Sequence, residues 1–338
     1  MDPEPTAEGG RLAARWSRYG RERLDRYLIQ EVEHPTINAQ SVLMRSFLVD
    51  RLHPGRFHDL IEEELYFSAC ASFALLGRRE GWFPQLHLAI ADPDPTVDSG
   101  LPGFLRADFR RQRARHFDVR ELFDQLARCL VAGFDDLTSP FEALWRSSLG
   151  EAGAAGPSRP GVLELACGSA NDYRFWDRYG LADWIDYQGI DVCHDNIANA
   201  RRRFPDVAFD TGDACRLALP DRSFDVVAVF DLYEHLSEEA MLEALTETSR
   251  VAGDELWLSL FNAAHVAEHL IQPADDYHWN LLSIPRLADE LRLQGFDSQA
   301  VDVGVELSDR FPDYRHYNEQ AHMLVAQRCD ATPRQIPD

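Results

Sequence analysis

The sequence contains no lysine, and all 34 of its basic side chains are arginine. A chain without lysine lacks the Schiff-base nucleophile and the lysine of the P-loop nucleotide site, so both chemistries are excluded. A compositional habit of the source genome would produce the same usage. We therefore interpret the missing lysine as a limit on mechanism and not as evidence for a partner.

Basic residues are also outnumbered: 34 arginines stand against 57 acidic residues, which gives the chain a formal net charge of −23. The arginines are dispersed along the sequence, and an acidic surface repels phosphate backbones and anionic lipids. We therefore expect neither nucleic acid nor a membrane as a partner. No apolar run reaches the 18 residues of a membrane span, and the opening "MDPEPTAEGG" lacks a secretory signal pattern, which favours a cytoplasmic protein.

The six cysteines include no C-x-x-C pair, which argues against a disulfide framework and a structural zinc site. Small residues and two prolines in "LGEAGAAGPSRPG" predict a linker at residues 151–160. We expect residues 1–10 to be disordered and residues 11–150, with apolar side chains at helical spacing, to form a helical domain. That domain is a candidate substrate cover or a contact for a homo-oligomer. Residues 161–330 form the second domain.

The second domain alternates short apolar runs with helical patterns, which predicts an α/β fold with a doubly wound sheet. The expected strands are "GVLELAC", "YQGIDV", "VAFDTG", "FDVVAVFD" and "ELWLSLFN". After a final helix come two more strand-like runs, "QAVDVGVEL" and "QAHMLVAQR". We expect no helix between these two runs and therefore an antiparallel pair.

The first strand ends in "VLELACGSAND", which places a carboxylate, Glu164, inside an apolar run. Gly168 allows a tight turn and a close approach of the backbone to a ligand. Asn171 and Asp172 then begin a helix whose first amides favour a negative group. In isolation, Glu164 could equally be a carboxylate whose hydrogen bonds are satisfied within the protein.

Polar side chains also follow the next three strands, at the edge where doubly wound sheets bind ligands. Asp191 can accept hydrogen bonds from ribose hydroxyls, and Asp213 can accept one from an adenine amine. The fourth strand ends in "FDLYEHL", which adds Asp231, Tyr233, Glu234 and His235 to the same edge. The alternative is that Asp191 and Asp213 are loop acids that cap helices.

The turn after the first strand distinguishes between two nucleoside cofactors. A nicotinamide dinucleotide needs G-x-G-x-x-G so that the glycines admit its pyrophosphate, but Ser169, Ala170 and Asn171 follow Gly168 here. S-adenosylmethionine has no phosphate, and the ammonium group of its amino-acid tail suits carboxylate acceptors. The pattern therefore favours S-adenosylmethionine.

In this order and spacing, "VLELACGSAND", "GIDV", "GDA" and "FDVVAVFDLYEHL" resemble the class I S-adenosylmethionine-dependent methyltransferases, which have a Rossmann-like fold. The resemblance covers residues 162–328 and implies a seven-stranded sheet of order 3-2-1-4-5-7-6 with an antiparallel last strand. The sequence departs from the family's D/E-x-G-x-G-x-G pattern at Ala166 and Ala170.

The resemblance also implies roles for individual residues. Glu164, Ala166 and Gly168 would line the methionine moiety, Asp191 would hold the ribose, and Asp213 with Ala214 would meet the adenine. The remaining cofactor-binding candidates are Asn171, Val192 and Asp231.

Candidate acceptor residues lie near His235 and in the long segment "NAAHVAEHLIQPADDYHWNLLS". Methyl transfer is an in-line displacement that needs a base only if the acceptor must lose a proton. His235 and His278 are the catalytic candidates, although His235 could instead be a structural histidine. The substrate-binding candidates are Tyr233, His265, His269, Tyr277 and Trp279. A metal bound by His265, His269 and His278 is an alternative, but we expect none.

These features together predict a methyltransferase that acts on oxygen, nitrogen or carbon of a small molecule. The alternatives are a non-catalytic cofactor-binding module for regulation or assembly, a protein or RNA methyltransferase, and an NAD-dependent dehydrogenase.

Overall fold

The structure is a computed structural model that describes residues 159–178, 180–274, 277–310, 318 and 320–330, together with Gly55 and His58. The disordered segment expected at residues 1–10 lies outside the described residues. So do the helical domain expected at 11–150, apart from those two positions, and most of the linker.

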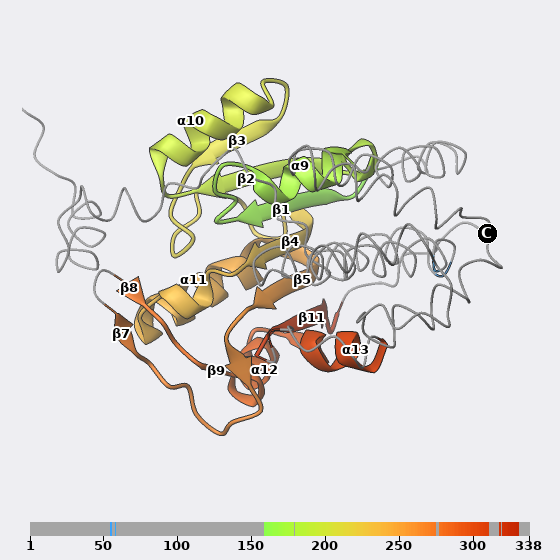
Figure 1. The fold of residues 1–338 in the computed structure, drawn as a ribbon. Helices are drawn as coiled ribbons and strands as arrows, with labels where there is room; N and C mark the ends of the chain where they lie inside the picture. The colour runs from blue at the N-terminus through green and yellow to red at the C-terminus, as the bar shows by residue number, and fades with distance from the viewer. Residues whose placement is uncertain are drawn as a thin grey trace, which may run out of the picture.

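The described region is built on a seven-stranded sheet of order β10-β11-β5-β4-β1-β2-β3 (Figure 1). The last strand along the chain, β11, is antiparallel to both β10 and β5. Numbered along the chain this order is 3-2-1-4-5-7-6, so the predicted topology is confirmed. The strands are β1 (Gly161–Leu165), β2 (Asp186–Asp191), β3 (Ala208–Thr211), β4 (Phe224–Phe230), β5 (Ala252–Leu260), β10 (Phe296–Asp302) and β11 (His322–Arg328).

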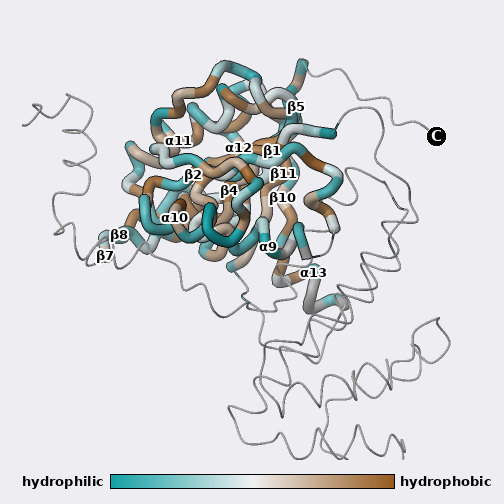
Figure 2. Tube along the Cα trace, turned by 90° about the horizontal axis from the view of Figure 1, so that it is seen from above, coloured by the Kyte–Doolittle hydropathy of each residue, from teal (hydrophilic) through white to brown (hydrophobic). Residues whose placement is uncertain are grey.

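Helices cover both faces of the sheet, which explains why the central strands are apolar along their length. Viewed from above, α9, α10 and α13 lie along one side and α11 and α12 along the other (Figure 2). Leu163 and Leu165 of β1 join the core beneath α11 and α12, whereas Val162 and Glu164 alternate to the other face. The helices are α9 (Asn171–Arg178), α10 (His194–Arg203), α11 (Glu238–Val251), α12 (Ile284–Leu293) and α13 (Val303–Arg310).

Helix α9 ends at Arg178, and a 3-10 helix, η2 (Leu181–Trp184), follows Gly180, which is in a left-handed conformation. One expected boundary was wrong. The predicted strand "QAVDVGVEL" stops at Asp302, because the Oδ1 atom of this residue accepts a hydrogen bond from the backbone N–H of Val305 at 2.9 Å. Helix α13 begins there, so a helix does separate β10 from β11, and the two strands nevertheless pair antiparallel.

The polar segment between β5 and α12 forms two small sheets that were not predicted. One joins β6 (Ala263–Ala264) to β9 (Leu282–Ser283) in parallel, and the other joins β7 (Pro273–Ala274) to β8 (Tyr277–His278) antiparallel. In Figure 1 the β7–β8 hairpin stands apart from the large sheet, at left, beside one end of α11. This places the hairpin near η3 (Tyr233–His235), the 3-10 turn that follows β4.

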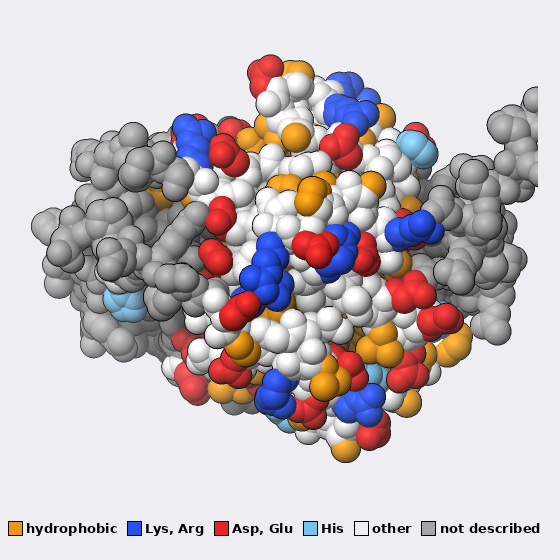
Figure 3. Space-filling view, turned by 180° about the vertical axis from the view of Figure 1, so that it is seen from behind, with side chains coloured by type: hydrophobic (Ala, Val, Ile, Leu, Met, Phe, Trp, Pro, Cys, Tyr) orange, Lys and Arg blue, Asp and Glu red, His pale blue; other side chains and the backbone are white. Residues whose placement is uncertain are grey.

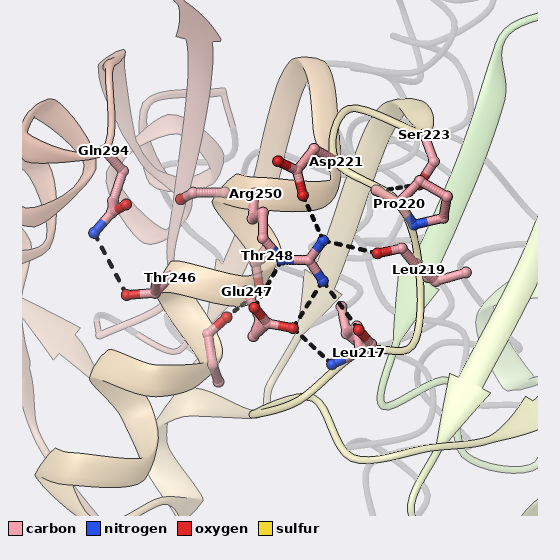
Figure 4. Close-up of polar contacts among 12 residues, drawn as sticks. Leu217, Leu219, Pro220, Asp221, Ser223, Thr246, Glu247, Thr248, Arg250 and Gln294 are labelled. Carbon is pink, nitrogen blue, oxygen red and sulfur yellow. Dashed lines mark hydrogen bonds and ion pairs between the residues drawn. The ribbon is translucent and has the colours of Figure 1, made fainter.

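Arg250 near the end of α11 fixes the loop between β3 and β4 (Figure 4). Its guanidinium donates to the carbonyl oxygens of Leu217 and Leu219 at 3.0 and 2.7 Å. It also donates to carboxylate oxygens of Glu247 and Asp221, each at 2.8 Å. Glu247 in turn accepts from the N–H of Leu217 at 2.7 Å. One half-buried cation thus holds the loop that leads into β4.

The surface of the described part carries charges of both signs, with acidic and basic side chains interspersed on the face shown in Figure 3. This agrees with the dispersion of arginine along the sequence. In the same part of the chain, no helix is long and apolar enough to cross a membrane.

Candidate active site

The turn after β1 contains three residues in the left-handed region. Ala166, Gly168 and Ala170 have φ values of 59°, 55° and 62°. Glycine adopts this conformation freely, but an alanine Cβ is crowded there. The two alanines therefore keep the backbone path that glycines would take. Arg203 of α10 holds the turn from outside by donating to the carbonyl oxygen of Ser169.

Asp191 joins the end of β2 to this turn. Its Oδ2 atom accepts from the N–H of Gly168 at 2.8 Å, and its Oδ1 atom accepts from the N–H of Cys193 at 2.7 Å. The side chain is buried, which raises its pKa, while these hydrogen bonds oppose the rise. A carboxylate has about four acceptor positions, so the bonds leave room for a hydroxyl donor. The ribose role of Asp191 stays a prediction beside this structural one.

Glu164 is buried among protein atoms, as its place in an apolar strand implies. It accepts a hydrogen bond from the Tyr187 hydroxyl at 2.5 Å. A side chain at Gly189 would collide with the Tyr187 hydroxyl, so the glycine makes space for this pair. Burial raises the pKa of Glu164 well above its usual range, and the negative charge of Asp172 raises it further.

Asp172, in the first turn of α9, also affects the end of β4. Burial by the surrounding protein, together with the charge of Asp172, raises the pKa of Asp231 to about 7, although the Asp231 side chain still reaches solvent. The backbone N–H of Asp231 donates to the carbonyl oxygen of Ser259 at 3.0 Å, which ties the end of β4 to β5. We call Glu164, Asp172, Asp191 and Asp231 the acidic edge.

The acidic edge lies where the carboxyl ends of three strands meet. Leu165 of β1 pairs with Ile190 of β2 and Val229 of β4, so the strands end at the same level. Burial and mutual repulsion both disfavour ionised carboxyls there. A positively charged ligand would relieve that repulsion.

The other expected cofactor residues lie in the adjoining turns. Val192 follows β2 directly, and the N–H of Gly212 donates to the carbonyl oxygen of Asp191 at 3.0 Å, which brings the turn after β3 alongside. Asp213 accepts from the N–H of Cys215 at 2.9 Å, and Ala214 lies between these two residues. Asn171 receives a hydrogen bond from Arg203 at 3.1 Å.

A second group of side chains gathers around His235. The centroid of its ring lies 5.3 Å from that of Phe261, 5.5 Å from that of Tyr277 and 5.7 Å from that of Trp279. These residues come from η3, the turn after β5, and the β7–β8 hairpin. We call His235, Phe261, Tyr277 and Trp279 the aromatic group. Of the four, only Phe261 was not predicted. It stands near the end of the expected strand "ELWLSLFN", where an apolar side chain usually belongs to the hydrophobic core.

The proton position on His235 follows from its contact with His278. The Nδ1 atom of His235 lies 3.2 Å from the backbone carbonyl oxygen of His278, which can only accept. Nδ1 therefore carries the hydrogen, and in the neutral ring the lone pair is on Nε2. Burial lowers the pKa of His235, which favours this neutral form. The structure thus brings the backbone of His278 to the site.

Two buried polar residues anchor the hairpin: Glu234, which was expected at this edge of the sheet, and Asn280, which was not predicted. Asn280 donates from Nδ2 to the carbonyl oxygen of Leu236 at 2.7 Å and accepts at Oδ1 from the N–H of Gln272 at 3.0 Å. Its backbone N–H donates to the carbonyl oxygen of Glu234 at 2.9 Å. The Glu234 carboxyl accepts from the N–H of Phe261 at 2.6 Å. Together they fix the aromatic group across three elements.

The structure does not bring three expected acceptor residues into the aromatic group. Tyr233 is fully buried in the core, where its hydroxyl lies 3.1 Å from that of Thr248. His269 accepts at Nδ1 from the N–H of Ser283 at 2.9 Å, so it supports the start of α12. His265 packs beside His322 at 5.5 Å between ring centroids. Among the described residues, no group of three or more His, Cys, Asp or Glu side chains could hold a metal ion.

Residues 162–254 match a family model described as a methyltransferase domain. The chain is 34% identical over 138 residues to demethylmenaquinone methyltransferase of Beutenbergia cavernae, a match covering 40% of this chain and 55% of that protein. It is 31% identical over 164 residues to a probable S-adenosylmethionine-dependent methyltransferase of Mycolicibacterium smegmatis, covering 46% and 59% of the two chains.

The solved structures that match include the 1,6-didemethyltoxoflavin-N1-methyltransferase of Burkholderia thailandensis. That match has a TM-score of 0.38 and 18% identity, and covers 68% of this chain and 88% of that one. The chain spans between half and two thirds of the length of the two relatives named above. The resemblance to methyltransferases is confirmed over residues 162–254, which match the methyltransferase-domain model.

Proposed function

We propose that the protein is a methyltransferase that uses S-adenosylmethionine to methylate a small molecule. The observation that carries this proposal is the acidic edge, whose carboxyls lie beside the β1 turn of the matched domain. S-adenosylmethionine supplies a methyl group on a positively charged sulfonium and also carries an ammonium group. Both charges suit this edge, whereas the pyrophosphate of a dinucleotide would be repelled.

The residues divide into parts for the three moieties of the donor. Glu164, Ala166, Gly168 and Asn171 surround the methionine part in this proposal, and Asp231 lies toward the sulfonium. Asp191 and Val192 hold the ribose, and Asp213 and Ala214 meet the adenine. Asp172, whose place in the sequence indicates only the start of a helix, joins this set, because its charge acts on both Glu164 and Asp231.

The acceptor then meets the aromatic group. Tyr277 and Trp279 contact the acceptor, and the neutral His235 accepts a proton from it where the reaction requires one. A small-molecule acceptor is supported by the relative named for demethylmenaquinone. The net charge of −23 disfavours nucleic acid as the acceptor.

We also propose a cytoplasmic enzyme in which residues 11–150 form a helical cover or an oligomer contact. Light scattering on the full chain and on a chain that begins at residue 151 tests this. We expect light scattering to show a larger assembly, or a methyl-transfer assay to give a lower KM for the acceptor, only when residues 11–150 are present.

The test of the donor is isothermal calorimetry with S-adenosylmethionine and, separately, with NADH. We expect binding of the former alone, and Asp172→Asn should weaken it about tenfold because one carboxylate of the acidic edge is removed. Asp195→Asn is the matched control, since Asp195 occupies the first turn of α10 and is exposed. Failure of S-adenosylmethionine to bind would refute the proposal, and tight binding without methyl transfer from a labelled donor to any metabolite would favour the regulatory module.

A further inference from the structure

The aromatic group presents ring surface to solvent at the same edge of the sheet as the acidic edge. Trp279 is 44% exposed although it is a large apolar side chain, and its ring centroid lies 4.9 Å from that of Phe261. The interplanar angles of 55° to 70° that Trp279 and Tyr277 make with their neighbours in the group are those of tilted and edge-on contacts. Such arrangements leave ring faces and edges for one more ring, which binds well in the same geometries.

The position of the group is fixed relative to the acidic edge. His235 follows Asp231 by four residues at the end of β4, and Phe261 follows β5, the neighbouring strand. Glu234 links the two ends, because its carboxyl accepts from the N–H of Phe261. A ligand held by the aromatic group therefore lies at the carboxyl edge of the sheet, where the acidic edge also lies.

The charges there select against an anionic acceptor. Asp231 and Glu234 both lie within four residues of His235 at the end of β4. Each of them, when ionised, raises the cost of placing another negative charge beside it. A neutral acceptor avoids this cost and can lose its proton during the reaction. His235 has the tautomer that suits this step, with hydrogen on Nδ1 and the lone pair on Nε2.

We propose that the acceptor is a neutral planar aromatic ring that carries a hydroxyl group, stacked against Trp279 and Phe261 with its hydroxyl toward His235. In the step, the O–H bond of the acceptor breaks and its proton passes to Nε2 of His235. The oxygen forms the new bond to the methyl carbon as the S–CH₃ bond breaks, and the sulfur keeps that electron pair as a neutral thioether. The inference rests on the proposed function, since it names the acceptor class of that site.

The first experiment measures binding to the protein saturated with S-adenosylhomocysteine, by equilibrium dialysis. The probes are catechol and 1-naphthol, each beside its saturated counterpart, 1,2-cyclohexanediol and decahydro-1-naphthol. We expect the aromatic probes to bind at least tenfold more tightly. Trp279→Ala should weaken their binding about threefold to tenfold, and Trp279→Phe should weaken it less, since one ring remains. Leu293→Ala is the control, because Leu293 is 79% exposed on α12.

The second experiment follows a labelled methyl group from donor to the same four probes and to an aliphatic amine, cyclohexylamine. We expect label in the aromatic alcohols alone. His235→Asn keeps a hydrogen-bond donor near the position of Nδ1 but removes Nε2. It should lower kcat more than it changes KM and abolish the acid limb of the pH profile.

Equal binding of aromatic and saturated probes, or transfer of label to cyclohexylamine in preference, would overturn the aromatic acceptor and leave the donor assignment standing. Failure of the unmodified protein to bind S-adenosylmethionine would instead overturn the proposed function. If Trp279→Ala failed to fold, the graded effect of Trp279→Phe on probe binding would decide the matter.

Discussion

The Asp191 carboxylate accepts a hydrogen bond from the N–H of Gly168 at 2.8 Å. This bond joins the end of β2 to the turn that follows β1, the neighbouring strand. Because the other oxygen of Asp191 accepts from Cys193, the same side chain also sets the start of α10. One buried carboxylate therefore shapes two of the turns that would surround the donor.

The substitution Asp191→Asn tests this role. An amide must point its NH₂ toward one of the two N–H donors, so one hydrogen bond is lost and one donor is left unsatisfied. We expect a loss of about 1–3 kcal/mol in the free energy of unfolding and weaker binding of S-adenosylmethionine. Denaturant titration and calorimetry measure the two effects. Asp210→Asn, at an exposed position of β3, should change neither, and a stable Asp191→Asn protein with unchanged affinity would contradict the prediction.

The raised pKa of Asp231, about 7, makes donor binding depend on pH. A cation binds the ionised carboxylate better, so we expect the affinity for S-adenosylmethionine to rise between pH 6 and pH 7.5 with release of protons. Calorimetry in buffers of different ionisation enthalpy counts those protons. Asp231→Asn should flatten the profile and is well tolerated in the backbone, because asparagine accepts a positive φ. A profile that stays as steep in this variant would contradict the assignment.

The same pKa shift makes the stability of the ligand-free protein depend on pH. The folded chain holds a proton on Asp231 up to about pH 7, whereas the unfolded chain loses it near pH 4. The unfolded state therefore binds fewer protons between these values, and stability should fall as pH rises from 4 to 7. The buried Glu164, whose pKa is also raised, acts in the same direction. Denaturant midpoints over this range, compared with those of Asp231→Asn, measure the contribution.

The alanine at 166 holds a conformation that glycine would adopt without strain. Ala166→Gly should raise the free energy of unfolding by about 0.5–1 kcal/mol, since relief of the left-handed strain outweighs the added freedom of the unfolded chain. Ala208→Gly, at an exposed position of β3, should instead lower it by a similar amount. Urea titrations of both variants give the comparison, and equal destabilisation by the two would rule out strain at residue 166.

Arg250 offers a test of the β3–β4 loop. Arg250→Lys keeps the charge, but an ammonium group cannot reach all the oxygens that the planar guanidinium contacts. We expect the variant to lose about 1–2 kcal/mol in the free energy of unfolding. The exposed pair of Arg292 with Asp289 provides the control, and Arg292→Lys should cost at most about 0.5 kcal/mol. Similar losses in both variants would show that the loop contacts contribute nothing special.

The order of the sheet could be predicted because its central strands are continuous apolar runs. The exception was the run that begins at Gln299, where Val301, Val303 and Val305 resemble a strand in spacing and β-branching. In the folded chain the Asp302 side chain caps the next turn and converts the second half into α13. A side-chain cap of this kind competes with β propensity and is not visible in apolar periodicity.

The acids of the candidate site could be predicted from their places at strand ends, but the direction of each side chain could not. Tyr233 lies at the correct edge, yet the 3-10 turn directs it into the core toward Thr248. Phe261 and Asn280 were not predicted, because their roles depend on contacts with Glu234, which lies as far as 46 residues away along the chain, from Glu234 to Asn280. Only the folded chain brings those segments together.

The acidic edge has a consequence for the order of events in turnover. Under the proposed function, the donor arrives with a sulfonium, and transfer of the methyl group converts that sulfur into an uncharged thioether. The carboxyls near Asp172 then face a ligand with one positive charge fewer, and their mutual repulsion returns. The reaction thereby weakens the hold of the protein on its own spent donor, so the site favours release and exchange over inhibition by the product.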